Sequence, residues 1–77
     1  MSRKSKSASP FLDNQEYLGF IYGEQRWRSG DRKRIYTWDS LHGEIEVFNT
    51  RGYHLGVLDK IGGRLIKSAV KGRKIRV

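Results

Sequence analysis

The sequence predicts a mainly β domain: a small, strongly twisted antiparallel sheet, half closed like a barrel, preceded by a short helical lead-in. Glycines recur every nine or ten residues from residue 43 onward, a spacing that is typical of an antiparallel meander. The segments between these glycines are rich in β-branched and aromatic residues. One of them alternates acidic residues with Ile45 and Val47, as expected for a strand with one buried face.

The expected elements follow one another along the chain. Residues 1–10 are basic and rich in Ser, which predicts a flexible arm, and residues 11–77 form one domain because 77 residues allow a single modest core. Within this domain, residues 11–23 predict a short helix or turn-rich lead-in, with Asp13 or Asn14 as the N-cap. Strands are expected over 33–39, 44–50, 53–59 and 64–70, with a further edge strand over 74–77.

Composition excludes several classes of protein. The chain has 16 Lys and Arg against 8 Asp and Glu, a net charge of +8, which predicts a polyanionic partner such as nucleic acid or an acidic protein. A membrane partner is not expected, because the basic segments contain Gly and β-branched residues instead of an amphipathic helix. Cysteine is absent, which suits a reducing cytosol, and no apolar segment of signal-peptide length follows the basic start. Neither a metal nor a small-molecule cofactor is expected.

An acidic island interrupts this basic chain, since residues 35–50 have a net charge of −3. We expect a hairpin whose tip is SLHG, with Asp39 at the end of the first strand and Glu44 at the start of the second, roughly opposite it. Glu46 lies on the same face of the second strand as Glu44. His42 is at the turn. Carboxylates so close together repel one another unless a cation lies between them, so this arrangement predicts a chemical role.

Cleavage of RNA needs such a group of residues. The ribose 2′-hydroxyl is the nucleophile, so the protein must supply a general base, a general acid and a cation for the phosphate. We expect Glu46 as the base, His42 as the acid, a nearby Arg or Lys as the cation, and Asp39 to orient His42. The products would be a 2′,3′-cyclic phosphate and a 5′-hydroxyl end.

These residues also carry a family resemblance. RKRIYTWDSLHGEIE (32–46) and GYHLGVLD (52–59) resemble the cytotoxic ribonuclease domain of the ribosome-inactivating colicins and cloacin, over about residues 26–77. The resemblance implies a twisted antiparallel sheet that cuts 16S ribosomal RNA of the small subunit at the decoding centre and so stops translation. It also implies an acidic immunity or antitoxin protein as a partner.

Site residues follow from this resemblance position by position. It implies four catalytic residues: Asp39, His42, Glu46 and Arg73. Lys67 takes the place of a substrate-contacting lysine. Arg76 and Lys71 remain rivals of Arg73 as the phosphate clamp, because residues 68–72 (SAVKG) replace a Pro-containing stretch of the family.

Further substrate contacts are expected from basic and aromatic residues. Trp27 lies within a basic cluster that suits a phosphate-binding surface, with a solvated charged loop as the alternative. This cluster comprises Arg26, Arg28, Arg32, Lys33 and Arg34. Tyr36 could stack on unpaired bases, whereas Trp38 is expected in the core. Glu44 is expected as a hydrophilic strand position or an Arg contact, and His54 as a structural hydrogen-bonded residue outside the site.

Two other functions are weighed. A non-catalytic basic β-barrel that binds RNA or ribosomes fits the charge, but it would gain nothing from acids beside its phosphate surface. Metal-dependent DNA cleavage fits poorly, because two scattered histidines and no cysteine offer no compact ligand set. The chain is expected to act in the bacterial cytoplasm, either as a free-standing toxin, which Met1 favours, or as a domain of a secreted bacteriocin.

Overall fold

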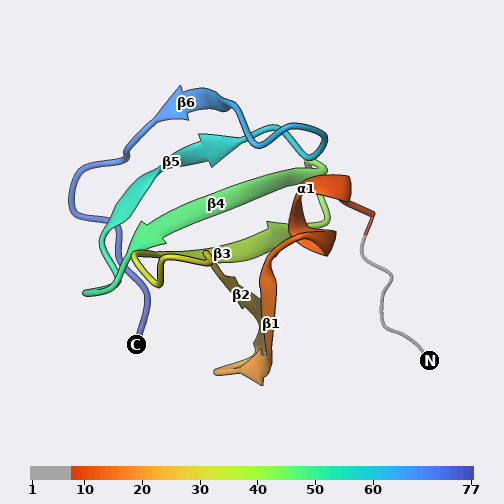
Figure 1. Cartoon of the computed structure of the whole chain (residues 1–77). Helices are drawn as coiled ribbons and strands as arrows, with labels where there is room; N and C mark the ends of the chain where they lie inside the picture. Colours follow the sequence, from red (N-terminus) through yellow and green to blue (C-terminus); the bar gives the residue numbers. More distant parts are fainter. Residues whose placement is uncertain (1–7) are drawn as a thin grey trace.

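The structure is a six-stranded antiparallel sheet with one short helix (Figure 1). This computed structural model describes residues 8–77, so most of the expected basic arm lies outside the described residues. The sheet order is β1-β2-β3-β4-β5-β6, each strand antiparallel to the next along the chain, which confirms the mainly β prediction and the meander. The elements are α1 (Pro10–Asp13), β1 (Glu16–Ile21), β2 (Glu24–Arg28), β3 (Arg34–Asp39), β4 (Glu44–Asn49), β5 (His54–Leu58) and β6 (Leu65–Ser68).

The beginning of the domain contains the predicted short helix, α1, but differs from the prediction in its N-cap and in the residues after the helix. The N-cap of α1 is Ser9, whose Oγ accepts a hydrogen bond from the Leu12 amide at 3.0 Å, and not Asp13 or Asn14. The residues that follow form the hairpin β1–β2, whereas the expected helix or turn-rich lead-in extended to residue 23. A β-bulge before Gly19 breaks the two-residue alternation of β1, which hides this strand from pattern analysis.

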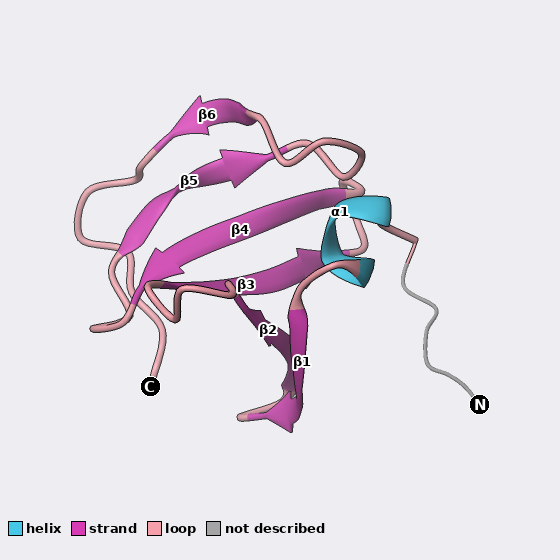
Figure 2. Ribbon diagram, in the orientation of Figure 1, coloured by secondary structure: helices cyan, strands magenta, loops and turns pink. Residues whose placement is uncertain are grey.

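The hydrophobic core lies on one face of the sheet, where α1 packs beside β3 and β4 (Figure 2). The helix is anchored at the β5–β6 loop, because the Lys60 carbonyl accepts hydrogen bonds from Ser9 Oγ at 2.7 Å and from the Phe11 amide at 3.1 Å. The buried cluster contains Leu12, Trp27, Tyr36, Ile45, Val47 and Leu58. Trp38 packs against this cluster, as predicted.

The core includes two aromatic residues that were expected to contact RNA. Tyr36 is 5% exposed and its ring meets the ring of Phe11 edge to face at 5.2 Å. Trp27 is 6% exposed. In a chain this short, the area that these rings bury is needed for the core, so the structure corrects their expected position at the surface.

The opposite face of the sheet carries the polar residues. Strand register places Glu46 of β4 beside Thr37 of β3 and Val57 of β5, and the same row continues to Arg26 on β2 and Lys67 on β6. Because successive residues of a strand point to opposite faces, this row lies away from the core. We call this surface the polar face.

The C-terminal residues approach the sheet without forming the expected edge strand. Residues 73–75 bond to the backbone at the start of β5 and the loop before it: the His54 amide donates to the Arg73 carbonyl at 3.0 Å and the Ile75 amide donates to the Gly52 carbonyl at 2.8 Å. An isolated bridge pairs Tyr53 with Lys74. Among residues 8–77, no helix is long and apolar enough to cross a bilayer.

Candidate active site

The tip of the β3–β4 hairpin holds His42 in a defined orientation. Asp39 Oδ1 accepts hydrogen bonds from the amides of Leu41 and His42 at 3.0 and 3.2 Å, and Asp39 Oδ2 lies 2.8 Å from His42 Nδ1. Gly43 closes the turn at φ 66°, where a side chain would be strained. The hydrogen bond from the His42 side chain is the main cause that lowers the pKa of Asp39 below its usual value. The side chain of His42 is 59% exposed, and Nδ1 donates to Asp39, so Nε2 is left for a substrate.

Glu46 is the second centre of the site. Its side chain is 10% exposed, and its Oε1 lies 2.6 Å from His54 Nε2 and 3.5 Å from a terminal guanidinium nitrogen of Arg73. The His54 ring is fully buried, and its Nδ1 accepts a hydrogen bond from the Val70 amide at 2.9 Å. The ring proton is therefore on Nε2, which donates to Glu46. Both contacts use Oε1, and no residue of the described range 8–77 makes a hydrogen bond or ion pair with Oε2 of Glu46.

Glu44 completes the acidic island. Its Oε1 lies 3.1 Å from Lys67 Nζ, so each of the three clustered carboxylates has a basic side chain beside it, and a lysine replaces the expected arginine contact. Ligand atoms of Asp39, His42 and Glu44 lie within 4.8 Å of one another. This compact set corrects the expectation that the histidines are too scattered to contribute to one.

The structure separates the three candidates for the phosphate clamp. Arg73 lies at Glu46, whereas the Arg76 guanidinium lies 5.1 Å from the ring centroid of Tyr22. Lys71 makes no ion pair with the acidic island within residues 8–77. Proximity to Glu46 therefore favours Arg73.

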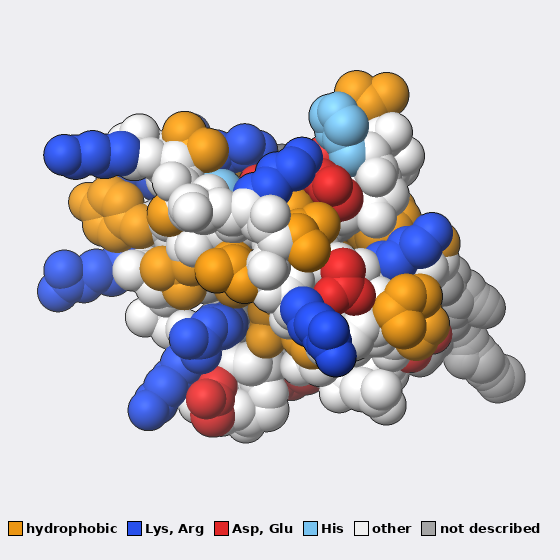
Figure 3. Space-filling model, turned by 90° about the horizontal axis from the view of Figure 1, so that it is seen from above, with side chains coloured by type: hydrophobic (Ala, Val, Ile, Leu, Met, Phe, Trp, Pro, Cys, Tyr) orange, Lys and Arg blue, Asp and Glu red, His pale blue; other side chains and the backbone are white. Residues whose placement is uncertain are grey.

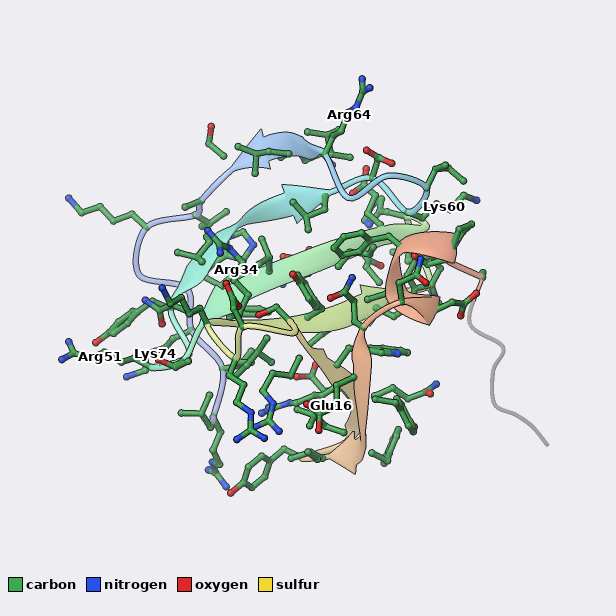
Figure 4. All side chains as sticks on the ribbon, viewed as in Figure 1. Glu16, Arg34, Arg51, Lys60, Arg64 and Lys74 are labelled. Atoms are coloured by element: carbon green, nitrogen blue, oxygen red, sulfur yellow. The ribbon has the colours of Figure 1, made fainter. Side chains whose placement is uncertain are left out.

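The expected basic cluster is divided between different environments. Arg26 is 4% exposed and contacts Glu24 at 3.3 Å, and Arg28 makes two hydrogen bonds to Glu16. Lys33 and Arg34 are exposed, and Arg34 is labelled in Figure 4. Among the cations expected to contact the substrate, the exposed ones are thus Arg32, Lys33, Arg34 and Lys67.

Sequence reasoning missed the contact of His54 with Glu46. Strict alternation from Val57, which pairs with Glu46, would place His54 on the core face. A β-bulge at Val47 and Phe48 shifts the register, pairs Phe48 with His54, and turns the imidazole to the polar face. Because His54 is one of only two histidines, the sequence could have marked it as a candidate site residue. The face of the sheet to which its imidazole points could not be predicted, because that face depends on the bulge.

This combination of fold and site defines a class of protein: a basic, mainly β domain whose sheet carries carboxylates, imidazoles and a guanidinium suited to proton transfer beside a phosphate. Figure 3, a view from above, shows a histidine and acidic side chains close to Lys or Arg side chains. A family model described as Cytotoxic matches residues 22–76, and the chain belongs to this family.

Curated relatives agree with this family. The chain is 38% identical to cloacin of Escherichia coli over 52 residues, which cover 66% of this chain, and 38% identical to colicin E3 of Escherichia coli over 53 residues, which cover 68%. Colicin-E6 of Escherichia coli is 36% identical over 52 residues, 66% of this chain. The matches span 9%, 10% and 9% of these three relatives, respectively. The chain therefore corresponds to a small part, about a tenth, of each of these curated relatives.

Proposed function

We propose that the chain is a metal-independent endoribonuclease toxin that cleaves 16S ribosomal RNA of the small subunit at the decoding centre. The observation that supports the chemistry is the pairing on the polar face of an exposed imidazole, held by Asp39, with a carboxylate held by His54 and Arg73. The choice of RNA target rests on the family resemblance of the hairpin sequence. Such a cut would stop translation.

In the proposed reaction, Glu46 Oε2 takes the proton of the ribose 2′-hydroxyl as the 2′-oxygen attacks the adjacent phosphorus. The bond from phosphorus to the 5′-oxygen breaks, and protonated His42 gives its Nε2 proton to that leaving oxygen. One proton is thus taken and one is given. Arg73 stabilises the charge that develops on the phosphate oxygens. The products are a 2′,3′-cyclic phosphate and a 5′-hydroxyl end.

Two neighbouring residues support these roles. Asp39 accepts the hydrogen bond from His42 Nδ1 and keeps Nε2 directed outward. Lys67, on the exposed strand β6, adds positive charge beside Glu44 and would contact the substrate. Asp39 would orient the imidazole, and Lys67 would attract the phosphate, at the tip of the β3–β4 hairpin.

The net charge and the family resemblance support the proposed partners and location. A net charge of +8 would speed association both with ribosomal RNA and with an acidic immunity or antitoxin protein. The ribosome places the activity in the bacterial cytoplasm. Co-purification with an acidic protein that blocks cutting would support this part of the proposal.

The proposal is tested with purified protein, ribosomes and EDTA. We expect one discrete fragment to be released from the small-subunit RNA. His42→Ala and Glu46→Gln should each lower the cutting rate by about 10²- to 10⁴-fold with little effect on RNA binding. Arg73→Ala should lower the rate more than the affinity. Leu41→Ala, next to His42 and 84% exposed, is the control and should cut normally.

Three outcomes would contradict the proposal. Intact RNA with the unmodified protein would favour the non-catalytic RNA-binding alternative. Cutting that EDTA abolishes and a divalent cation restores would favour a metal at Asp39, His42 and Glu44. Equal losses of binding and cutting in the His42 and Glu46 variants would show that the assigned roles are wrong.

A further inference from the structure

An open hollow beside the C-terminal residues takes no part in the proposed reaction. It is lined by Arg51, Lys74, Ile75, Arg76 and Val77. Three of these five residues have cationic side chains and none has an acidic side chain. Figure 4 shows Arg51 and Lys74 together at one end of the molecule.

The three cations of this hollow have no carboxylate partner within the described residues. The Lys74 ammonium lies 5.1 Å from the ring centroid of Tyr53, and the Arg76 guanidinium lies 5.1 Å from that of Tyr22. The acids of the polar face, in contrast, are each paired with a basic group. Cationic side chains that pair with no acidic side chain in a concave surface attract an anion.

Tyr22 shows a second feature that packing does not explain. It occupies the two-residue turn between β1 and β2 at φ 49°, a left-handed conformation at which Asn, Asp or Gly is usual. Its ring is nevertheless 60% exposed. A bulky residue that strains a turn without filling the core is expected where a binding surface needs it.

Below this ring lies a buried guanidinium that is incompletely paired. Arg26 lies 5.5 Å from the Tyr22 ring centroid, is 4% exposed, and contacts one carboxylate, that of Glu24. Its Nε is buried without a hydrogen-bond partner in the part of the chain that the structure describes. Positive charge thus reaches Tyr22 both from β2 and from Arg76.

Cations next to exposed aromatic rings are suited to single-stranded nucleic acid, in which phosphates bind the charges and bases stack on the rings. Tyr53, 45% exposed, is the second such ring. An acidic protein would use the charges but would not need two aromatic faces. The combination therefore favours RNA over an acidic protein at this surface.

The hollow also lies within reach of the active site. Arg73 contacts Glu46, and Arg76 follows three residues later, at most about 10 Å along an extended chain. We propose that Arg51, Lys74 and Arg76 bind a phosphate of the RNA strand that is cut at Glu46, while Tyr22 and Tyr53 stack its unpaired bases. This inference rests on the proposed function and extends the substrate site to residues beyond the reacting group.

The first test removes charge from the hollow. Arg51→Gln/Lys74→Gln is compared with Lys60→Gln/Arg64→Gln, which removes the same charge from exposed residues that Figure 4 places elsewhere on the molecule. Both pairs are made in a His42→Ala background to prevent cutting. We expect the first pair to reduce the slope of log affinity against log salt by about 1.4 for a single-stranded RNA of about 12 nucleotides. Binding of a dinucleotide, and the slope of the control pair, should not change.

The second test uses Tyr22→Asn, which suits the turn better and removes the ring. We expect a higher melting temperature together with an affinity for the same RNA that is about 5- to 100-fold weaker. Weaker binding with lower stability would instead indicate a structural role and would overturn the assignment of Tyr22.

The two proposals can fail separately. Equal salt slopes for the two charge variants would overturn the inference and would favour an acidic protein as the ligand of the hollow. This conclusion would hold whether or not the unmodified chain cuts ribosomes. Failure of the unmodified chain to cut ribosomes would overturn the proposed function, and the binding tests would still report on the hollow.

Discussion

At the scale of single residues, His54 determines how Glu46 is presented. The Val70 amide occupies Nδ1 of the buried ring, so Nε2 must donate, and the acceptor is Oε1 of Glu46. This donor fixes one oxygen of the carboxylate, and in the proposed reaction the other oxygen would accept the proton of a ribose hydroxyl. Glu46 is thus oriented by a residue that does not itself reach the substrate.

Removing this support should affect the rate more than binding. We expect His54→Ala to lower kcat about 100-fold with little change in KM, and to lower the free energy of unfolding by about 2 kcal/mol, because buried polar groups lose their partners. His54→Gln keeps a donor near the position of Nε2 and should recover part of kcat. Steady-state cleavage assays and urea unfolding measure these effects. Unchanged kcat in His54→Ala would contradict a positioning role.

Asp39 should make the stability of the domain depend on acid pH. Its pKa is lowered in the folded chain, chiefly by the hydrogen bond from His42, whereas an unfolded Asp has a pKa of about 3.9. Between the two values the folded state binds fewer protons than the unfolded state, so stability rises with pH. The contribution is complete above about pH 4 and is lost as pH falls through the lowered pKa. We expect the stability difference between the unmodified chain and Asp39→Asn to shrink below about pH 4 in urea unfolding at a series of pH values. A constant difference would exclude this linkage.

At the scale of elements, the C-terminal residues are part of the site although they form no regular strand. The Gly52 carbonyl accepts the hydrogen bond from Ile75, and Gly52 itself has φ 88°. A Cβ added at Gly52 would collide with the Ile75 carbonyl oxygen. This glycine therefore allows the close approach that carries Arg73 to Glu46.

Gly52→Ala should displace the C-terminal residues from the sheet. We expect a loss of at least about 2 kcal/mol in the free energy of unfolding, from the collision and from the left-handed φ, and a lower cutting rate through Arg73. Gly30→Ala is the matched control, because a Cβ there meets no atom within 4 Å and needs no left-handed backbone. If the two variants have equal stability and activity, the close contact at Gly52 is not required.

A strand could be predicted from the sequence where its residues alternate regularly between the two faces of the sheet. Strands β3 to β6 lie within the segments expected from glycine spacing and alternation, and Glu44 and Glu46 share a face as the register predicts. Two bulges defeated the same reasoning: the one at Gly19 concealed β1, and the one at Val47 and Phe48 turned His54 to the polar face. Bulges change which way side chains point without leaving a clear composition signal.

At the scale of the whole molecule, the sheet divides two tasks between its faces. One face buries aromatic and aliphatic residues under α1, and the other presents the acidic island together with basic side chains. In the proposed function, the net charge of +8 would attract a polyanion to the domain, and the paired acids would supply proton transfer at one point of that surface. A tyrosine predicted at the surface, Tyr36, was needed for the core instead.

The ends of the cleaved RNA test the central claim most directly. Ribosomal RNA cut in EDTA should carry a 2′,3′-cyclic phosphate on one side and a 5′-hydroxyl on the other, and an RNA with a 2′-deoxyribose at the cut position should stay intact. This result is required if Glu46 takes a proton from the 2′-hydroxyl and His42 returns one to the leaving oxygen. A 5′-phosphate end, or cutting of the deoxy substrate, would contradict the mechanism, because the nucleophile would then be water and not the ribose.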